Sequence, residues 1–137
     1  MKLAAISGSN GPAVGIVNDD EMILDLTAAW TSLRGTDGSP APRTLLDVLG
    51  HDGLLPRLAA RIDDTREPAL RPHRRALDDV TLRAPLPECG KLICVASNYA
   101  AHIAEAGQEA PHDRHAFTPW LFLKPATTIV GPGAPIA

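Results

Sequence analysis

His102 and Glu105 are the residues whose types and spacing point most directly to chemistry. They lie three apart in a segment that predicts a short helix, so both side chains project from one face and can approach each other. A carboxylate hydrogen-bonded to an imidazole fixes the tautomer of the ring and makes it a general base able to activate water near neutral pH. Such pairs are also common on helix surfaces, so the spacing alone does not establish a catalytic site.

A strand and a helical turn are expected to position this pair. The apolar run LICVA at 92–96 predicts a strand, and SNYAAHIAEAG after it predicts a helical turn that Ser97 or Asn98 caps and Gly107 ends. Beyond a polar stretch, WLFLK at 120–124 predicts another strand. The closing TTIVGPGAPIA begins a further element without finishing it.

The first half of the chain predicts a small module of its own. Apolar runs at 2–7, 13–17 and 22–26 are separated by turn-forming residues and predict three antiparallel strands. Thr27 is expected to cap a short helix that stops at Gly35.

Two amphipathic helices are expected next, opened by Thr44 and by Asp52. Residues 63–79 then shift to charge and proline, which is typical of a linker. We place a domain boundary near residue 75.

The predicted organisation is a small amino-terminal domain at 1–75 followed by the beginning of a catalytic domain at 76–137, which the sequence presents as incomplete. The fold class is α+β, mainly β. Thirteen prolines and eleven glycines predict many turns and few long helices.

Composition excludes several classes of protein. A hydrophobic fraction of 45% without a long apolar run argues against a membrane span. A net charge of -3 with interspersed signs argues against nucleic acid as a partner. The amino terminus reads as a strand and not as a signal peptide, so we expect a cytoplasmic protein.

Other reactive residue types have plainer interpretations. Cys89 and Cys94 match neither a redox nor a zinc spacing, and Cys94 is expected to be a buried core thiol. His112, Asp113 and His115 lie in irregular sequence flanked by proline, so we interpret them as a solvated loop and not as metal ligands.

The strings KLICVASNYAAHIAEAGQEAP and LFLKPATTIVGPGAPI together resemble the signature segment of the fumarylacetoacetate hydrolase family. In that pattern a buried strand leads to Asn-Tyr-x-x-His-x-x-Glu, a mobile lid, Leu-Phe-x-Lys-Pro and a Gly-Pro-x turn. The matching positions here are Asn98, Tyr99, His102, Glu105, Phe122, Lys124, Pro125, Gly131 and Pro132. The segment GIVNDDEMILDLT also resembles the small first domain of the family.

The resemblance implies roles for the matched residues. His102 and Glu105 become the dyad that activates water, while Lys124 helps to hold substrate or a developing oxyanion. Tyr99 becomes a substrate contact, although capping or packing explains Asn98 and Tyr99 equally well. Lys124 has a simpler alternative too, as a strand-end lysine that reaches solvent. The lid corresponds to residues 108–119.

The resemblance also implies Mg or Mn, held by carboxylates that follow the Gly-Pro-x turn. Residues 133–137 contain no carboxylate, so we expect no metal ligand within this chain and no turnover by this chain alone. Ala96 and Ala101 depart from the family pattern, which often has Gly and an acidic residue at these positions.

The implied function is that of a metal-dependent hydrolase that cleaves a carbon-carbon bond in a 1,3-diketo or 2-oxo acid and acts as a homodimer when complete. An isomerase, decarboxylase or lyase of the same family, working through a metal enolate, is the first alternative. A non-catalytic binding or scaffold module without the metal site is the second.

Overall fold

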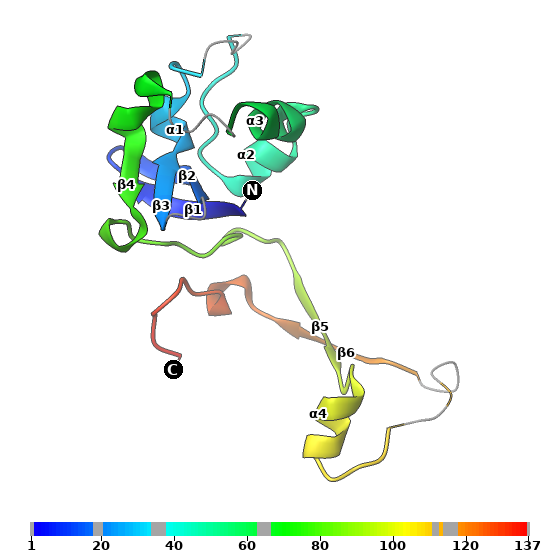
Figure 1. Cartoon of the computed structure of the whole chain (residues 1–137). Coiled ribbons are helices and arrows are strands. Elements are labelled where there is room, and N and C mark those ends of the chain that lie inside the picture. The colour runs from blue at the N-terminus through cyan, green and yellow to red at the C-terminus, as the bar shows by residue number, and fades with distance from the viewer. Residues whose placement is uncertain are drawn as a thin grey trace. The chain divides into compact units, whose positions relative to one another are not determined.

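The computed structural model (Figure 1) describes residues 2–17, 21–33, 38–62, 67–110, 113 and 118–136. The chain divides into two compact units, one formed by Met1–Leu86 with Val130–Ala137 and the other by Pro87–Ile129. Helices occur together with antiparallel sheets, in agreement with the predicted α+β class. No helix among the described residues has the length and apolar character needed to cross a membrane.

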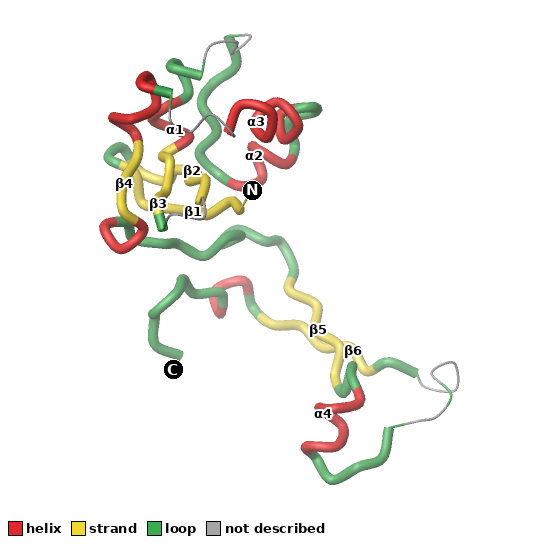
Figure 2. Tube along the Cα trace, viewed as in Figure 1, coloured by secondary structure: helices red, strands yellow, loops and turns green. Residues whose placement is uncertain are grey.

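The first unit is built on a four-stranded antiparallel sheet (Figure 2). In sheet order its strands are β1 (Lys2–Gly8), β2 (Gly11–Val17), β3 (Met22–Asp25) and β4 (Arg74–Ala76). The first three confirm the predicted strands. The fourth lies within the expected linker, and residue 75 is one of the three positions that pair with β3. The two compact units divide between Leu86 and Pro87, and the domain boundary near residue 75 stays a prediction.

The helix after β3 begins differently from the prediction. It is short, α1 (Leu26–Ala29), and the Asp25 carboxylate caps it by accepting a hydrogen bond from the Ala28 amide at 2.9 Å. Thr27, the predicted cap, instead accepts a hydrogen bond from the Val14 amide and donates one to a loop carbonyl. Its hydroxyl therefore ties the helix to β2.

The next two helices follow the prediction more closely. Thr44 caps α2 (Leu45–Leu49) in a capping box, in which its hydroxyl accepts from the Asp47 amide and the Asp47 carboxylate accepts from the Thr44 amide. The third helix is α3 (Leu54–Ile62). Two 3-10 turns, Pro68–His73 and Leu77–Asp79, flank β4.

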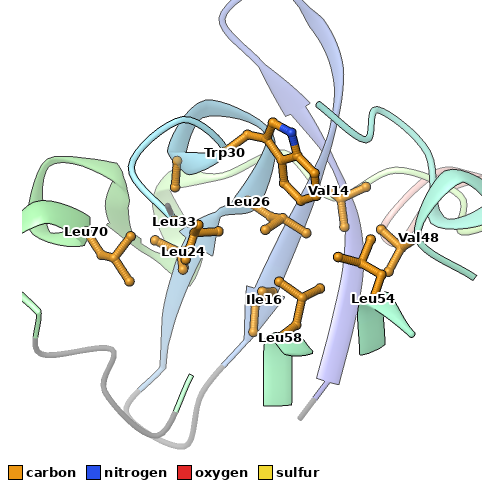
Figure 3. Packing of buried hydrophobic residues seen from close by; sticks show 11 residues of the cluster. Val14, Ile16, Leu24, Leu26, Trp30, Leu33, Val48, Leu54, Leu58 and Leu70 are labelled. Atoms are coloured by element: carbon orange, nitrogen blue, oxygen red, sulfur yellow. The ribbon is translucent and has the colours of Figure 1, made fainter. Parts of the chain in front are cut away.

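Apolar side chains cover both faces of this sheet, because successive residues of a strand point to opposite sides. On one face the helices pack over a large cluster (Figure 3), whose members are Val14, Ile16, Leu24, Leu26, Ala29, Trp30, Leu33, Val48, Leu54, Leu58 and Leu70. On the other face a smaller cluster contains Ile6, Ala13, Ile23 and Val80. The first unit therefore has a core of its own.

The second unit is a two-stranded antiparallel sheet with one short helix. Strands β5 (Leu92–Ala96) and β6 (Trp120–Lys124) confirm the two predicted strands. Helix α4 (Ala100–Glu105) follows β5, and a 3-10 turn, Ala126–Thr128, follows β6. None of the described residues between Pro87 and Ile129 is buried. Cys94, predicted to be a buried core thiol, is only partly buried because one thin sheet cannot enclose it.

The ends of α4 are set by the backbone. Its amino-terminal cap residue is Tyr99, which makes no side-chain cap hydrogen bond, so the predicted capping by Ser97 or Asn98 is wrong. Gly107 ends the helix as predicted, with a φ of 71° and an amide that donates to the Ala104 carbonyl at 2.9 Å.

The predicted Gly-Pro-Gly turn lies near the end of the described chain. The Ala134 amide donates to the Gly131 carbonyl at 3.2 Å and closes this turn.

Candidate active site

The candidate site begins where β5 ends and the chain turns into α4. Ser97 makes that turn in the left-handed region with a φ of 49°, which is uncommon for a residue other than glycine. Strained backbone of this kind is concentrated at functional sites, where the surrounding structure has to hold it. The turn leads through the exposed Asn98 to Tyr99 and the first residue of α4.

The structure brings His102 and Glu105 together. Nδ1 of His102 and Oε2 of Glu105 are 3.2 Å apart, so the imidazole donates to the carboxylate when Nδ1 carries the proton. The two side chains are 54% and 72% exposed, respectively, so water competes for this contact. In this tautomer Nε2 has no proton and can accept one from a ligand or a water molecule.

Tyr99 joins this pair through its ring. The centroids of the Tyr99 and His102 rings are 5.4 Å apart, with 31° between their planes. The Tyr99 carbonyl also accepts hydrogen bonds from the amides of His102 and Ile103, at 3.1 and 3.2 Å, respectively. Sequence reasoning named Tyr99 but missed this contact, although the spacing of three residues between the two rings was a usable signal.

Lys124 lies elsewhere in the second unit. It is the exposed last residue of β6 and pairs in register with Leu92, the first residue of β5. The dyad follows the other end of β5, so four residue steps along the strand, or roughly 13 Å, separate the two ends of β5. No hydrogen bond or ion pair between Lys124 and the dyad is found within the described parts of the chain.

The predicted lid and the expected absence of metal ligands are two further expectations, and they can be compared with the structure only for the described residues. Half of the predicted lid, including His112 and His115, lies outside the described residues. Among the residues that are described, no group of three or more His, Cys, Asp or Glu side chains gathers closely enough to hold a metal ion. The described side chains therefore do not fit a Mg or Mn site, and we derive no step through a metal.

Taken together, the described side chains form an arrangement whose chemistry allows proton transfer. Glu105 contacts one nitrogen of His102, the Tyr99 ring lies beside the imidazole, and the second ring nitrogen can accept a proton in this tautomer. An exposed general base of this kind needs other parts of a protein to bind a substrate beside it.

Comparison with known proteins shows that this chain is similar to one enzyme family. A family model described as Fumarylacetoacetate (FAA) hydrolase C-terminal matches residues 91–137, which include β5, α4 and β6. Oxaloacetate tautomerase YisK of Bacillus subtilis is 31% identical over 97% of this chain and 44% of its own length. Maleylpyruvate hydrolase of Aquipseudomonas alcaligenes is 30% identical over 93% of this chain and 44% of its own length.

A third relative, protein Rv2993c of Mycobacterium tuberculosis, is 36% identical over 79% of this chain and 34% of its own length. This chain thus spans less than half the length of each of these relatives. The activities in the names of the first two relatives, tautomerisation of oxaloacetate and hydrolysis of maleylpyruvate, differ from each other.

Proposed function

Because this chain belongs to the fumarylacetoacetate hydrolase family, we propose that it supplies the general base of an enzyme that acts on a 2-oxo acid. The observation that carries this proposal is the contact of 3.2 Å between Nδ1 of His102 and Oε2 of Glu105. It leaves Nε2 as the nitrogen that takes a proton, from water or from a carbon next to a carbonyl group.

Two reactions can use such a base. In a keto-enol tautomerisation, Nε2 removes a proton from the carbon beside the ketone. The C–H electron pair forms the carbon-carbon double bond, and a proton is delivered to the ketone oxygen. This reading is supported by the relative named as an oxaloacetate tautomerase, whose alignment covers nearly the whole of this chain. It asks the least of the described residues, because proton transfer alone is required.

Hydrolytic cleavage of a carbon-carbon bond is the second candidate. Here Nε2 takes a proton from water while the water oxygen attacks a carbonyl carbon, and the bond to the neighbouring carbon then breaks to release an enolate. The relative named as maleylpyruvate hydrolase, which also aligns over most of the chain, favours this reaction. The family resemblance implies a divalent metal for the complete enzyme in either reaction.

Lys124 and the expected partners enter only as proposals. The proposed role of Lys124 is to help to hold the substrate or a developing oxyanion; its pairing with Leu92, at the start of β5, favours contact with a part of the substrate away from the dyad. A small 2-oxo or diketo acid as substrate, a second copy of the chain in a homodimer, and the cytoplasm as compartment complete the proposed picture.

The test uses the complete natural polypeptide that carries this sequence, whatever its length. It is assayed with Mg or Mn for enolisation of oxaloacetate and for cleavage of an acylpyruvate. His102→Ala should lower kcat by about 100-fold or more, the usual contribution of a general base, with little change in metal affinity. His51→Ala, which removes a histidine of the first unit, is the matched control.

The two reactions give different outcomes. Turnover of oxaloacetate without cleavage of the acylpyruvate supports the tautomerase, and the reverse supports the hydrolase. Full activity of the His102→Ala protein, or no reaction with either substrate, would contradict the proposal. For residues 1–137 on their own, the expectation remains no turnover.

A further inference from the structure

Tyr99 has two separate connections to the candidate base. Through its backbone, its carbonyl accepts the amides of His102 and Ile103 and so starts α4. Through its side chain, its ring lies 5.4 Å from the His102 ring at 31°. The first connection needs no particular side chain, whereas the second needs an aromatic ring.

The geometry of that ring contact lies in the range of favourable aromatic pairs, whose centroids are about 4.5–7 Å apart. An imidazole held only by Glu105 can still swing about its Cβ–Cγ bond, because one hydrogen bond on an exposed side chain restrains it weakly. A second contact, from the tilted Tyr99 ring, restricts that rotation. With both contacts in place, the direction of Nε2 is set.

We propose that Tyr99 is a positioning residue for His102, and that its aromatic ring, not its hydroxyl group, sets the orientation of the imidazole. This inference rests on the proposed function only in assuming that His102 is the base. It differs from the role that the family resemblance implies for Tyr99, which is contact with the substrate. A substrate contact would use the hydroxyl group, the one polar part of this side chain.

The first experiment uses the 137-residue chain and needs no enzymatic activity. Proton and nitrogen NMR spectra of the His102 ring report two properties, the ring-current shift from Tyr99 and the fraction of the Nδ1–H tautomer. We expect Tyr99→Phe to keep both properties. Tyr99→Leu should remove the ring-current shift and lower the fraction of the Nδ1–H tautomer.

Folding of α4 can be checked in the same spectra. The Ile103 amide donates to the Tyr99 backbone carbonyl, so its protection from exchange should survive both substitutions. Glu105→Gln is the matched control, because it changes the partner of Nδ1 and leaves the Tyr99 ring in place. If Tyr99→Leu left the shift and the tautomer unchanged, or if Tyr99→Phe abolished them, the positioning role would be overturned.

The second experiment separates the two roles of Tyr99 by kinetics in the complete natural polypeptide. Positioning predicts that Tyr99→Leu lowers kcat by roughly tenfold at nearly constant KM, and that Tyr99→Phe restores kcat, since misplacing a catalytic group costs rate and not binding. A higher KM in Tyr99→Phe would instead assign the hydroxyl group to the substrate and reject the proposal. Failure of the His102→Ala test with these NMR results intact would reject the proposed function alone.

Discussion

Leu26 and Leu123 are the same residue type in the two units of this chain, yet Leu26 is fully buried and Leu123 is 68% exposed. The two tryptophans repeat the contrast, since Trp30 is 7% exposed in the first unit and Trp120 is 74% exposed in the second. The first unit buries its apolar residues on both faces of its sheet. The second keeps Ile93, Val95 and their neighbours in contact with solvent.

The contrast separates stability from chemistry within one chain. The first unit contains capped helices and a packed core, and it carries none of the residues proposed to do chemistry. Among the described residues of the second unit, the contacts found for the His102 and Glu105 pair are local ones, along one turn of α4. A dyad can therefore be arranged by sequence-local geometry on an exposed helical turn, without a packed core around it.

The first prediction concerns the different burial of Leu26 and Leu123, and it has the largest expected change in the free energy of unfolding. Leu26→Ala should lower the free energy of unfolding of the first unit by about 2–5 kcal/mol, the usual cost of deleting a buried leucine. Leu123→Ala should change it by less than about 0.5 kcal/mol, as exposed substitutions do. Urea unfolding followed by Trp30 fluorescence, in a Trp120→Phe background, measures both. Equal losses in the two variants would contradict the contrast.

A smaller effect is expected at the capping box of α2. Thr44→Ala removes the hydroxyl that accepts the Asp47 amide at 3.1 Å and should destabilise the first unit by about 1 kcal/mol. Thr44→Ser keeps the oxygen and should recover most of that loss. Thr128→Ala, which removes a hydroxyl bonded to the Pro125 carbonyl in the second unit, should leave the Trp30 transition unchanged.

That capping box was predictable from sequence, because every group in it lies within four residues. The pairing of His102 with Glu105 was predictable for the same reason. By contrast, β4 pairs with a strand about fifty residues away, and its charged residues gave no sign of it. The distance between Lys124 and the dyad likewise depends on the register of β5 with β6, which side-chain spacing within either strand does not reveal.

The misplaced caps have a related cause. The sequence places Asp25 at the end of a strand and so favours Thr27 as the cap of α1, but the Thr27 hydroxyl bonds to β2 and a loop, and Asp25 caps the helix. At α4 the backbone of Ser97 has a positive φ, and the helix begins after Tyr99, so neither Ser97 nor Asn98 is the cap residue. Choices of this kind depend on backbone geometry, and residue preferences alone did not settle them.

A dependence of stability on pH is expected from Asp47. The hydrogen bond from the Arg43 amide is the largest cause that lowers the pKa of Asp47 below its ordinary value of 3.8; burial opposes it, and further hydrogen bonds from Thr44 add to the lowering. A carboxyl group whose pKa is lowered by folding stabilises the fold above its unfolded pKa. That contribution is lost as pH falls below 3.8 and through the pKa of the folded state.

Asp47→Asn should therefore be less stable than the wild type near neutral pH, and the difference should shrink in acid. Urea midpoints of the two proteins from about pH 6 to about pH 3 would reveal the convergence. Asp52→Asn, five residues away, is the matched control. A gap between wild type and Asp47→Asn that stays constant over this range would show that the carboxylate charge does not contribute.

The smallest expected effect is at Ser97, where the second unit stores backbone strain. Ser97→Gly relieves the cost of a φ of 49° but gives the unfolded chain more freedom, so the net gain should be only about 0.5 kcal/mol. Amide exchange of Ile103, which donates to the Tyr99 carbonyl, should slow by about twofold if exchange follows local opening. Ser97→Val should speed that exchange, because a β-branched residue tolerates positive φ poorly. The Trp30 transition should stay fixed in both variants, and a shift there would mean that α4 and the first unit unfold together.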